Sequence, residues 1–256
     1  MTQMADIRLA DHPPVQAPAA ELGGRVLGEA GGPVTGTSAA SPSAARDAAR
    51  HATMIARRAL DVVVATLVLL CLLPLLLVVA ALIKLDSPGP ILFRQRRIGK
   101  ELRPFTVLKF RTMHTNASSD AHMRYIAEVA RAQEGGGDGS TLKKLTDDPR
   151  VTRVGRTLRR LSIDEIPQLL NVLAGNMALV GPRPAIEYEL EHYQPVHFER
   201  FNVRPGITGL WQVSGRSTVG FKEMLDLDAE YATCATLRTD LRILVRTPRA
   251  AVRDAA

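Results

Sequence analysis

Two adjacent carboxylates, Asp164 and Glu165, lie in a basic stretch of the sequence that prolines interrupt. An ionised aspartate can attack phosphorus, and a neighbouring glutamate can hold Mg²⁺, which binds one or two carboxylates together with substrate phosphates. The pair therefore indicates chemistry on a phosphate, with both carboxylates as candidate metal ligands. A structural alternative is that Ser162 and Glu165 form a capping box at the start of a helix. Five arginines precede the pair: Arg150, Arg153, Arg156, Arg159 and Arg160.

Four cationic side chains are the candidates for binding that phosphate: Lys109, Arg111, Arg150 and Arg183. Lys109 and Arg111 end a predicted strand and share one face of it, where they either grip a diphosphate or are solvated. Arg183 lies between two prolines in Gly181–Pro184, a rigid mount that suits bidentate recognition of phosphate; the alternative is a structural turn. Arg150 begins the basic run before the carboxylates.

The composition favours a polyanionic partner. The 256 residues carry a net charge of +7, which attracts nucleic acid, anionic lipid headgroups or phosphorylated substrates. Aromatic residues make up 4% of the chain, too few for stacking platforms, so we expect no nucleic-acid partner. The sequence contains neither a Walker A nor a Gly-x-Gly-x-x-Gly motif. We interpret Asp226-Leu227-Asp228 as a surface or packing feature of a helix.

A run of 22 uncharged residues, Val62–Ile83, contains Pro74. As a straight helix this run would reach roughly 33 Å, enough to cross a bilayer core. Pro74 predicts a kink, because proline removes a backbone donor. Basic residues flank the run on both sides, and basic flanks favour the cytoplasm. Two interpretations follow: a spanning helix that tolerates Pro74, or a re-entrant helix that dips into one leaflet and returns.

The remaining sequence predicts an α+β domain that is mainly helical. Alternation predicts a small β-hairpin from strands over 91–96 and 105–110. Arginines every three or four residues between 238 and 253 predict a basic amphipathic helix, either on an anionic membrane surface or with a solvated arginine face, which Pro248 should break. A polar segment is expected over 115–147, and the other helices over 121–133, 151–174 in one or two pieces, 186–201 and 219–232.

Taken together, the motifs between Arg57 and Thr247 resemble those of the bacterial sugar transferase family, the monotopic phosphoglycosyl transferases. Blocks of this length in one order are highly specific. Leu102 departs from the pattern, because the family often has glycine there, and so does Asn176, where aspartate is usual. The matching blocks are Pro88–Pro90, Phe93–Gly99, Lys109–Met113, Asp148–Gly155, Ser162–Leu169, Val180–Pro184 and Arg204–Arg216.

The resemblance implies an enzyme that moves a sugar-1-phosphate from a UDP-sugar to undecaprenyl phosphate and releases UMP, the first membrane step of exopolysaccharide assembly. Asp164 maps to the family's nucleophile, which forms a covalent phospho-sugar intermediate, and Glu165 to its Mg²⁺ ligand. Lys109, Arg111 and Arg183 map to phosphate-binding positions. The segment 211–216 is similar to that of members that use hexoses such as galactose or glucose.

The resemblance also implies that the apolar helix is re-entrant, with both ends cytoplasmic, in a short form of the family. We expect a disordered tail over 1–53, a re-entrant membrane helix hairpin over 54–86 and a cytoplasmic catalytic domain over 87–256. The protein would lie at the bacterial inner membrane among anionic lipids, and a homo-oligomer is compatible with this. The alternative is a membrane-anchored basic module that binds lipid or nucleic acid without catalysis, and which does not need Asp164.

Overall fold

The computed structural model describes residues 42–115, 148–215 and 219–253. Three predictions fall wholly or partly outside them: residues 1–41 of the tail expected over 1–53, the helix expected over 121–133, and all but the first residue of the polar segment 115–147.

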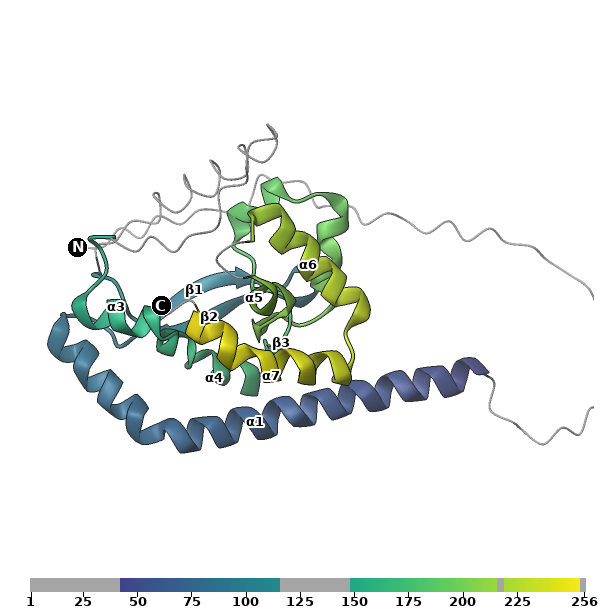
Figure 1. Ribbon diagram of the computed structural model, residues 1–256, viewed down its shortest axis with the longest axis horizontal. Helices are drawn as coiled ribbons and strands as arrows, with labels where there is room; N and C mark the ends of the chain where they lie inside the picture. Colours follow the sequence, from purple (N-terminus) through teal and green to yellow (C-terminus); the bar gives the residue numbers. More distant parts are fainter. Residues whose placement is uncertain (1–41, 116–147, 216–218, 254–256) are drawn as a thin grey trace, which may run out of the picture. The chain divides into compact units, whose positions relative to one another are not determined.

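The apolar segment forms one long helix, α1, from Pro42 to Asp86, which therefore begins upstream of position 54. Its stretch His51–Asp86 is long and apolar enough to cross a membrane. Figure 1 shows that α1 bends in its second half and continues as a helix. A bend is the effect expected of Pro74, which lies inside the helix. The two-armed re-entrant hairpin is not confirmed, because the chain stays helical through the proline.

The predicted β-hairpin is confirmed. Strand β1 (Leu92–Ile98) pairs antiparallel with β2 (Pro104–Phe110), and the register sets Arg97 opposite Phe105 and Phe93 opposite Lys109. Residues opposite each other in such a pair lie on the same face. The hairpin therefore presents Arg97 and Lys109 on one face of its two strands.

The turn between these strands contains the departure from the family pattern. A 3₁₀ turn, η1 (Lys100–Leu102), connects β1 to β2, and Glu101 and Leu102 both have a φ of 57°. This left-handed conformation costs a residue with a β-carbon roughly 1–2 kcal/mol, and glycine adopts it freely. Leu102 thus occupies a position where the backbone favours glycine.

A second strand pair was not predicted. Strand β3 (Ala178–Val180) runs parallel to β4 (Gly206–Thr208). The two backbones come so close that a β-carbon on Gly206 would lie 2.1 Å from the nitrogen of Gly181. Glycine is therefore required at this crossing.

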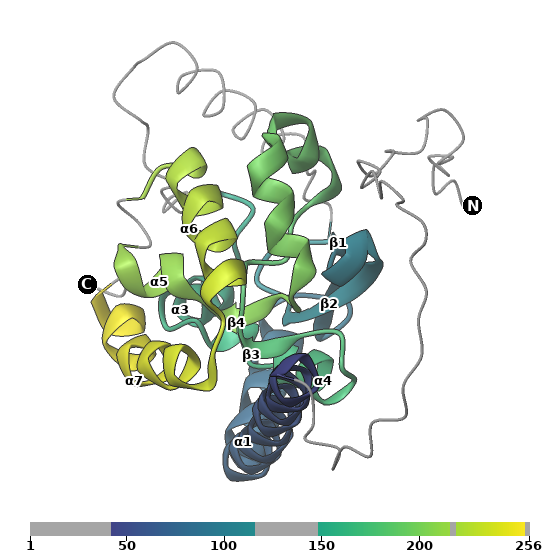
Figure 2. The ribbon, with the colours of Figure 1, turned by 90° about the vertical axis from the view of Figure 1, so that its right-hand side faces the viewer.

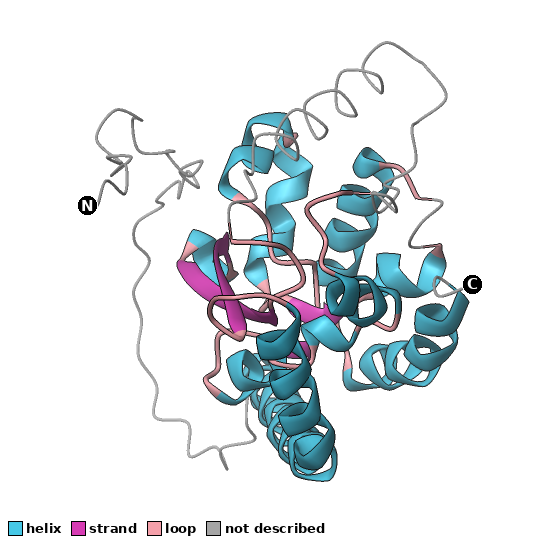
Figure 3. Cartoon of the chain, turned by 90° about the vertical axis from the view of Figure 1, so that its left-hand side faces the viewer, coloured by secondary structure: helices cyan, strands magenta, loops and turns pink. Residues whose placement is uncertain are grey.

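Short helices surround the strands (Figures 2 and 3). The helical pieces expected over 151–174, 186–201 and 219–232 are present. Helix α7 (Leu237–Arg253) runs past Pro248, so the predicted break is wrong. The hydroxyl of Thr247, next to the proline, lies 2.8 Å from the hydroxyl of Thr208. The elements are α3 (Arg153–Arg160), η2 (Ile163–Glu165), α4 (Gln168–Leu173), η3 (Glu187–His192), η4 (Pro195–Asn202), α5 (Leu210–Ser214), α6 (Phe221–Cys234) and α7 (Leu237–Arg253).

The main core joins α1, β2, α4 and β3. Its fully buried members include Ala65, Val107, Val172 and Val180. Asn171 of α4 adds two hydrogen bonds to this core. Its side chain accepts from Leu108 N at 3.0 Å and donates to Thr106 O at 2.7 Å. These hydrogen bonds fix helix α4 against strand β2.

Polar contacts attach α1 to the rest of the fold near both of its ends. Arg57 pairs with Asp240 of α7, and Arg58 donates to the last carbonyls of α4. Asp61 accepts from Leu179 N, and at the other end Asp86 accepts from Val154 N in the first turn of α3. These polar contacts attach the helix at two separate positions, around Arg57–Asp61 and at Asp86.

We predict that Leu102→Gly raises the free energy of unfolding by about 1 kcal/mol, because glycine relieves the left-handed conformation. Leu102 is 40% exposed, so little packing is lost. The measurement is thermal unfolding in detergent, followed by circular dichroism. Arg103→Gly is the matched control: its φ is −77°, so glycine there should destabilise. A lower midpoint for Leu102→Gly than for the parent chain would show that the turn is not strained.

Candidate active site

The carboxylate pair lies in the 3₁₀ turn η2, between α3 and α4. Ser162 enters this turn with a φ of 56° and makes no side-chain cap there, so the capping-box interpretation is wrong. Asp164 is buried, with 8% of its surface exposed, whereas the Glu165 side chain is 29% exposed. The neighbouring carboxylates thus occupy different environments.

Lys109, one of the predicted cations, contacts Glu165 of the carboxylate pair. Its Nζ lies 2.9 Å from Oε1 of Glu165, and both side chains are partly exposed. The contact joins the end of β2 to η2. It places a positive charge beside Glu165.

Arg111 has a different environment from the one predicted. It is buried, and its guanidinium donates to the carbonyls of Ser87 and Pro88, at 2.6 and 3.0 Å. Gly89 permits this approach, because a β-carbon there would lie 2.1 Å from Nη1 of Arg111. In this conformation Arg111 fixes the connection between α1 and β1.

Arg150 forms a bidentate pair with Asp148, with N–O distances from 2.6 to 3.1 Å. The hydrogen bonds from Arg150 lower the pKa of Asp148 from 3.8 to about 2. His114 N donates to the carbonyl of Arg150, so the pair lies beside the chain that leaves β2. The same stretch leads into α3 and the carboxylates.

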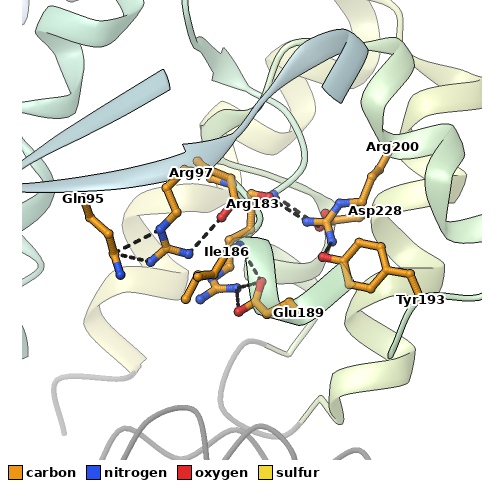
Figure 4. Close-up of polar contacts among 9 residues, drawn as sticks. Gln95, Arg97, Arg183, Ile186, Glu189, Tyr193, Arg200 and Asp228 are labelled. Carbon is orange, nitrogen blue, oxygen red and sulfur yellow. Dashed lines mark hydrogen bonds and ion pairs between the residues drawn. The ribbon is translucent and has the colours of Figure 1, made fainter. Parts of the chain in front are cut away.

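Arg183 is paired with a carboxylate that the sequence analysis did not identify. Its Nη1 donates to both oxygens of Glu189, at 2.9 and 3.1 Å, and Glu189 is fully buried (Figure 4). Burial alone would raise the pKa of Glu189, but Arg183 and Arg97 lower it, so the carboxylate is ionised. The pair holds the Arg183 guanidinium in a fixed position.

A second buried pair supports the same loop. Arg200 Nη2 lies 2.7 Å from Asp228 and 2.6 Å from the carbonyl of Arg183. Burial raises the pKa of Asp228 to about 6, against the opposing effect of Arg200. Asp226 is exposed and contacts His197 and Lys222. The interpretation of Asp226-Leu227-Asp228 as a surface and packing feature is confirmed.

Sequence reasoning missed Glu189 and Arg200 and gave Asp228 only a surface or packing role, because each looks like an ordinary charged residue of a helical stretch. The signal that could have revealed them is charge at positions whose helical neighbours are apolar. Arg97 stands inside the matched block Phe93–Gly99 but was not assigned a role. All four are buried.

Asp164 and Glu165 are the candidate ligands for Mg²⁺. The described residues contain no group of three or more His, Cys, Asp or Glu side chains that could hold a metal ion. Mg²⁺ needs no such group, because it retains waters and is usually bound by one or two carboxylates plus substrate phosphates. Glu165, with Asp164 beside it, fits that donor set.

This arrangement, on a domain with a membrane-length helix, suits a membrane-associated enzyme that acts on phosphates. Residues 52–254 match the bacterial sugar transferase family, and the chain therefore belongs to that family. The matched range covers every predicted site residue.

Curated proteins that are similar to this chain agree with the family match. The exopolysaccharide production protein ExoY of Sinorhizobium fredii is 43% identical over 75% of this chain and 84% of its own length. The UDP-glucose:undecaprenyl-phosphate glucose-1-phosphate transferase of Caulobacter vibrioides is 44% identical over 77% of this chain and 70% of its own length. The undecaprenyl-phosphate galactose phosphotransferase of Salmonella typhimurium is 36% identical over 80% of this chain and 42% of its own length. The chain is thus an enzyme of the transferase class.

We predict that Asp148→Asn lowers the unfolding temperature at pH 7 and that the difference shrinks as the pH falls from about 4 to about 2. The pKa of Asp148 is lower in the folded chain, about 2 against 3.8, so its contribution to stability is complete above pH 3.8 and is lost below. Thermal unfolding at a series of pH values measures this. Glu223→Gln, at an exposed position of α6, is the control; a pH-independent difference would refute the linkage.

Proposed function

We propose that the chain transfers a sugar-1-phosphate from a UDP-sugar to undecaprenyl phosphate and releases UMP, as the first membrane step of exopolysaccharide assembly. The observation that carries this is the buried Asp164 next to the Lys109–Glu165 pair, within the family match. The relatives' names support the substrates: one is a UDP-glucose:undecaprenyl-phosphate glucose-1-phosphate transferase, and another an exopolysaccharide production protein. Either glucose or galactose is the expected sugar, because the relatives include a galactose phosphotransferase.

In the first step, a carboxylate oxygen of Asp164 attacks the β-phosphorus of the UDP-sugar. The bond between that phosphorus and the bridging oxygen breaks, and UMP leaves with the electron pair. In the second step, a phosphate oxygen of undecaprenyl phosphate attacks the same phosphorus, which restores the Asp164 carboxylate and forms the lipid diphosphate sugar. Two steps avoid a direct encounter between two anionic substrates.

The surrounding side chains lower the charge repulsion in each step. Lys109 places an ammonium beside Glu165, and Arg183 offers a guanidinium that Glu189 holds in place. Glu165, with Asp164, would hold Mg²⁺, which neutralises phosphate charge when bound. Arg150 and Arg111 complete the set of phosphate-binding candidates; in the structure they hold the chain on either side of the site, through Asp148 and through Ser87 and Pro88.

The contacts of α1 support a re-entrant arrangement in the cytoplasmic leaflet of the inner membrane. Arg57 and Asp86 lie about 43 Å apart along a straight helix, yet the same domain contacts both. A helix that crossed the bilayer would carry these residues to opposite sides, where one domain could not reach them. A bend at Pro74 keeps both ends on the cytoplasmic side, at the height of the undecaprenyl phosphate headgroup.

We predict that detergent-purified protein, given Mg²⁺, undecaprenyl phosphate and a UDP-hexose, releases UMP, and that Asp164→Asn lowers the rate by on the order of 10³-fold or more, as losing a nucleophile does. The measurement is UMP release across a panel of UDP-sugars. Asp226→Asn, which removes an exposed carboxylate, is the matched control and should leave the rate unchanged. Undiminished release from Asp164→Asn would exclude the nucleophile assignment. Anionic-lipid binding without release of UMP from any donor would favour the non-catalytic binding module.

A second prediction concerns topology. In a chain with Cys71 and Cys234 replaced by serine, we expect Ser43→Cys and Glu101→Cys to react with a membrane-impermeant maleimide only after cell lysis. Both positions would then face the cytoplasm. A permeant maleimide, which should label both in intact cells, is the control. Labelling of position 43 alone in intact spheroplasts would establish a spanning helix instead.

A further inference from the structure

Arg97 is a buried cation without a carboxylate partner among the residues that the structure describes. It is 8% exposed. Its Nη1 donates to the carbonyl of Pro184 at 3.0 Å, and its Nε and Nη2 donate to Oε1 of Gln95, at 3.0 and 2.7 Å (Figure 4). All these acceptors are neutral. Burial and the nearby Arg183 charge lower the pKa of Arg97 to about 10, against the opposing effect of the Glu189 carboxylate, so Arg97 stays charged at neutral pH.

The neighbouring guanidinium groups are each neutralised. Arg183 pairs with Glu189, and Arg200 pairs with Asp228. In this cluster three cations share two carboxylates, and among the described residues Arg97 is the cation of the three with no direct carboxylate contact. A buried charge without a counter-ion is costly, and the cost is removed when an anion binds.

The Arg97 guanidinium lies on the side of the fold that carries the carboxylate pair. Arg97 shares the hairpin face of Lys109, and Glu165 is among the charges that act on the pKa of Arg97. The carbonyl that Arg97 holds belongs to Pro184, next to the phosphate-binding candidate Arg183. An anion at Arg97 would thus lie on the side of the carboxylate pair.

The hydrogen bonds to Gln95 show how such an anion would bind. The Nε–Nη2 edge of a guanidinium is a fork that matches carboxylate and phosphate oxygens. In Arg97 a single carboxamide oxygen accepts from both nitrogens of that fork. Gln95 therefore occupies the fork without neutralising it.

We propose that the Nε–Nη2 edge of Arg97 binds a substrate phosphate, and that Gln95 occupies this edge until the phosphate replaces it. The assignment of the phosphate to a substrate rests on the proposed function. Two substrates carry this chemistry: the diphosphate of the UDP-sugar and the phosphate of the lipid acceptor. A role in the fold alone would instead have Arg97 only tie β1 to the loop at Pro184.

The variant Gln95→Glu separates these two roles. It places a carboxylate of nearly the same shape against the fork. If Arg97 serves the fold alone, the new ion pair leaves ligand binding intact. If Arg97 binds phosphate, the internal carboxylate competes, and affinity falls by about tenfold or more, the usual loss for a hydrogen bond to a charged group. Arg97→Gln should show the same loss, and Arg96→Gln is its charge-matched control, an exposed residue on the opposite face of β1.

The experiment is calorimetric titration of the full chain in nanodiscs with UDP and with inorganic pyrophosphate, beside the KM for undecaprenyl phosphate. Weaker binding of UDP and pyrophosphate in Gln95→Glu and Arg97→Gln, but not in Arg96→Gln, supports the proposal for the donor. Unchanged UDP binding with a raised KM for the lipid supports it for the acceptor. Variants that melt like the parent chain and change neither quantity overturn it. The titrations need no turnover, so absent UMP release would refute the proposed function separately.

Discussion

The docking of α1 by polar contacts is the constraint on which the rest of the structure depends. An apolar helix with exposed leucines could lie anywhere in a bilayer, but Arg57, Asp61 and Asp86 bind it to α7, β3 and α3. Charged groups at these positions avoid the hydrocarbon only if the domain covers them or the membrane surface lies there. In the re-entrant arrangement that we propose, the domain and the helix share one level, and the carboxylates between α3 and α4 lie near the surface of the membrane.

Much of the fold could be predicted, because its larger elements carry a local signal. Alternation over 91–96 and 105–110 predicted the hairpin, and uniform apolarity predicted α1. The pairing of β3 with β4 could not be predicted, because three residues are too few for a periodic pattern and the pairing is parallel and distant in sequence. The break expected at Pro248 is wrong: the helix continues to Arg253, and Thr247, next to the proline, contacts the hydroxyl of Thr208.

The candidate site was predictable in residue type but not in pairing. Motifs indicated Asp164, Glu165 and the cations, and the contact between Lys109 and Glu165 agrees with a shared site. The role of Arg111 in binding Ser87 and Pro88 depends on backbone carbonyls, which have no sequence signature. The same holds for the partner of Arg183, because Glu189 is one acidic residue among several in its stretch.

The division of labour between the two carboxylates follows from the turn that holds them. A 3₁₀ turn has about three residues per turn, so adjacent side chains point roughly 120° apart. Asp164 is accordingly buried, while Glu165 reaches the partly exposed Lys109. An ion pair at partly exposed positions contributes about 1 kcal/mol or less, so Glu165 can change partners at little cost when charged substrates arrive. The buried pairs of Arg183 and Arg200 have no such freedom. The buried pairs Arg183–Glu189 and Arg200–Asp228 thus fix the loop that carries Arg183. The weaker Lys109–Glu165 pair lies beside Asp164, the proposed nucleophile.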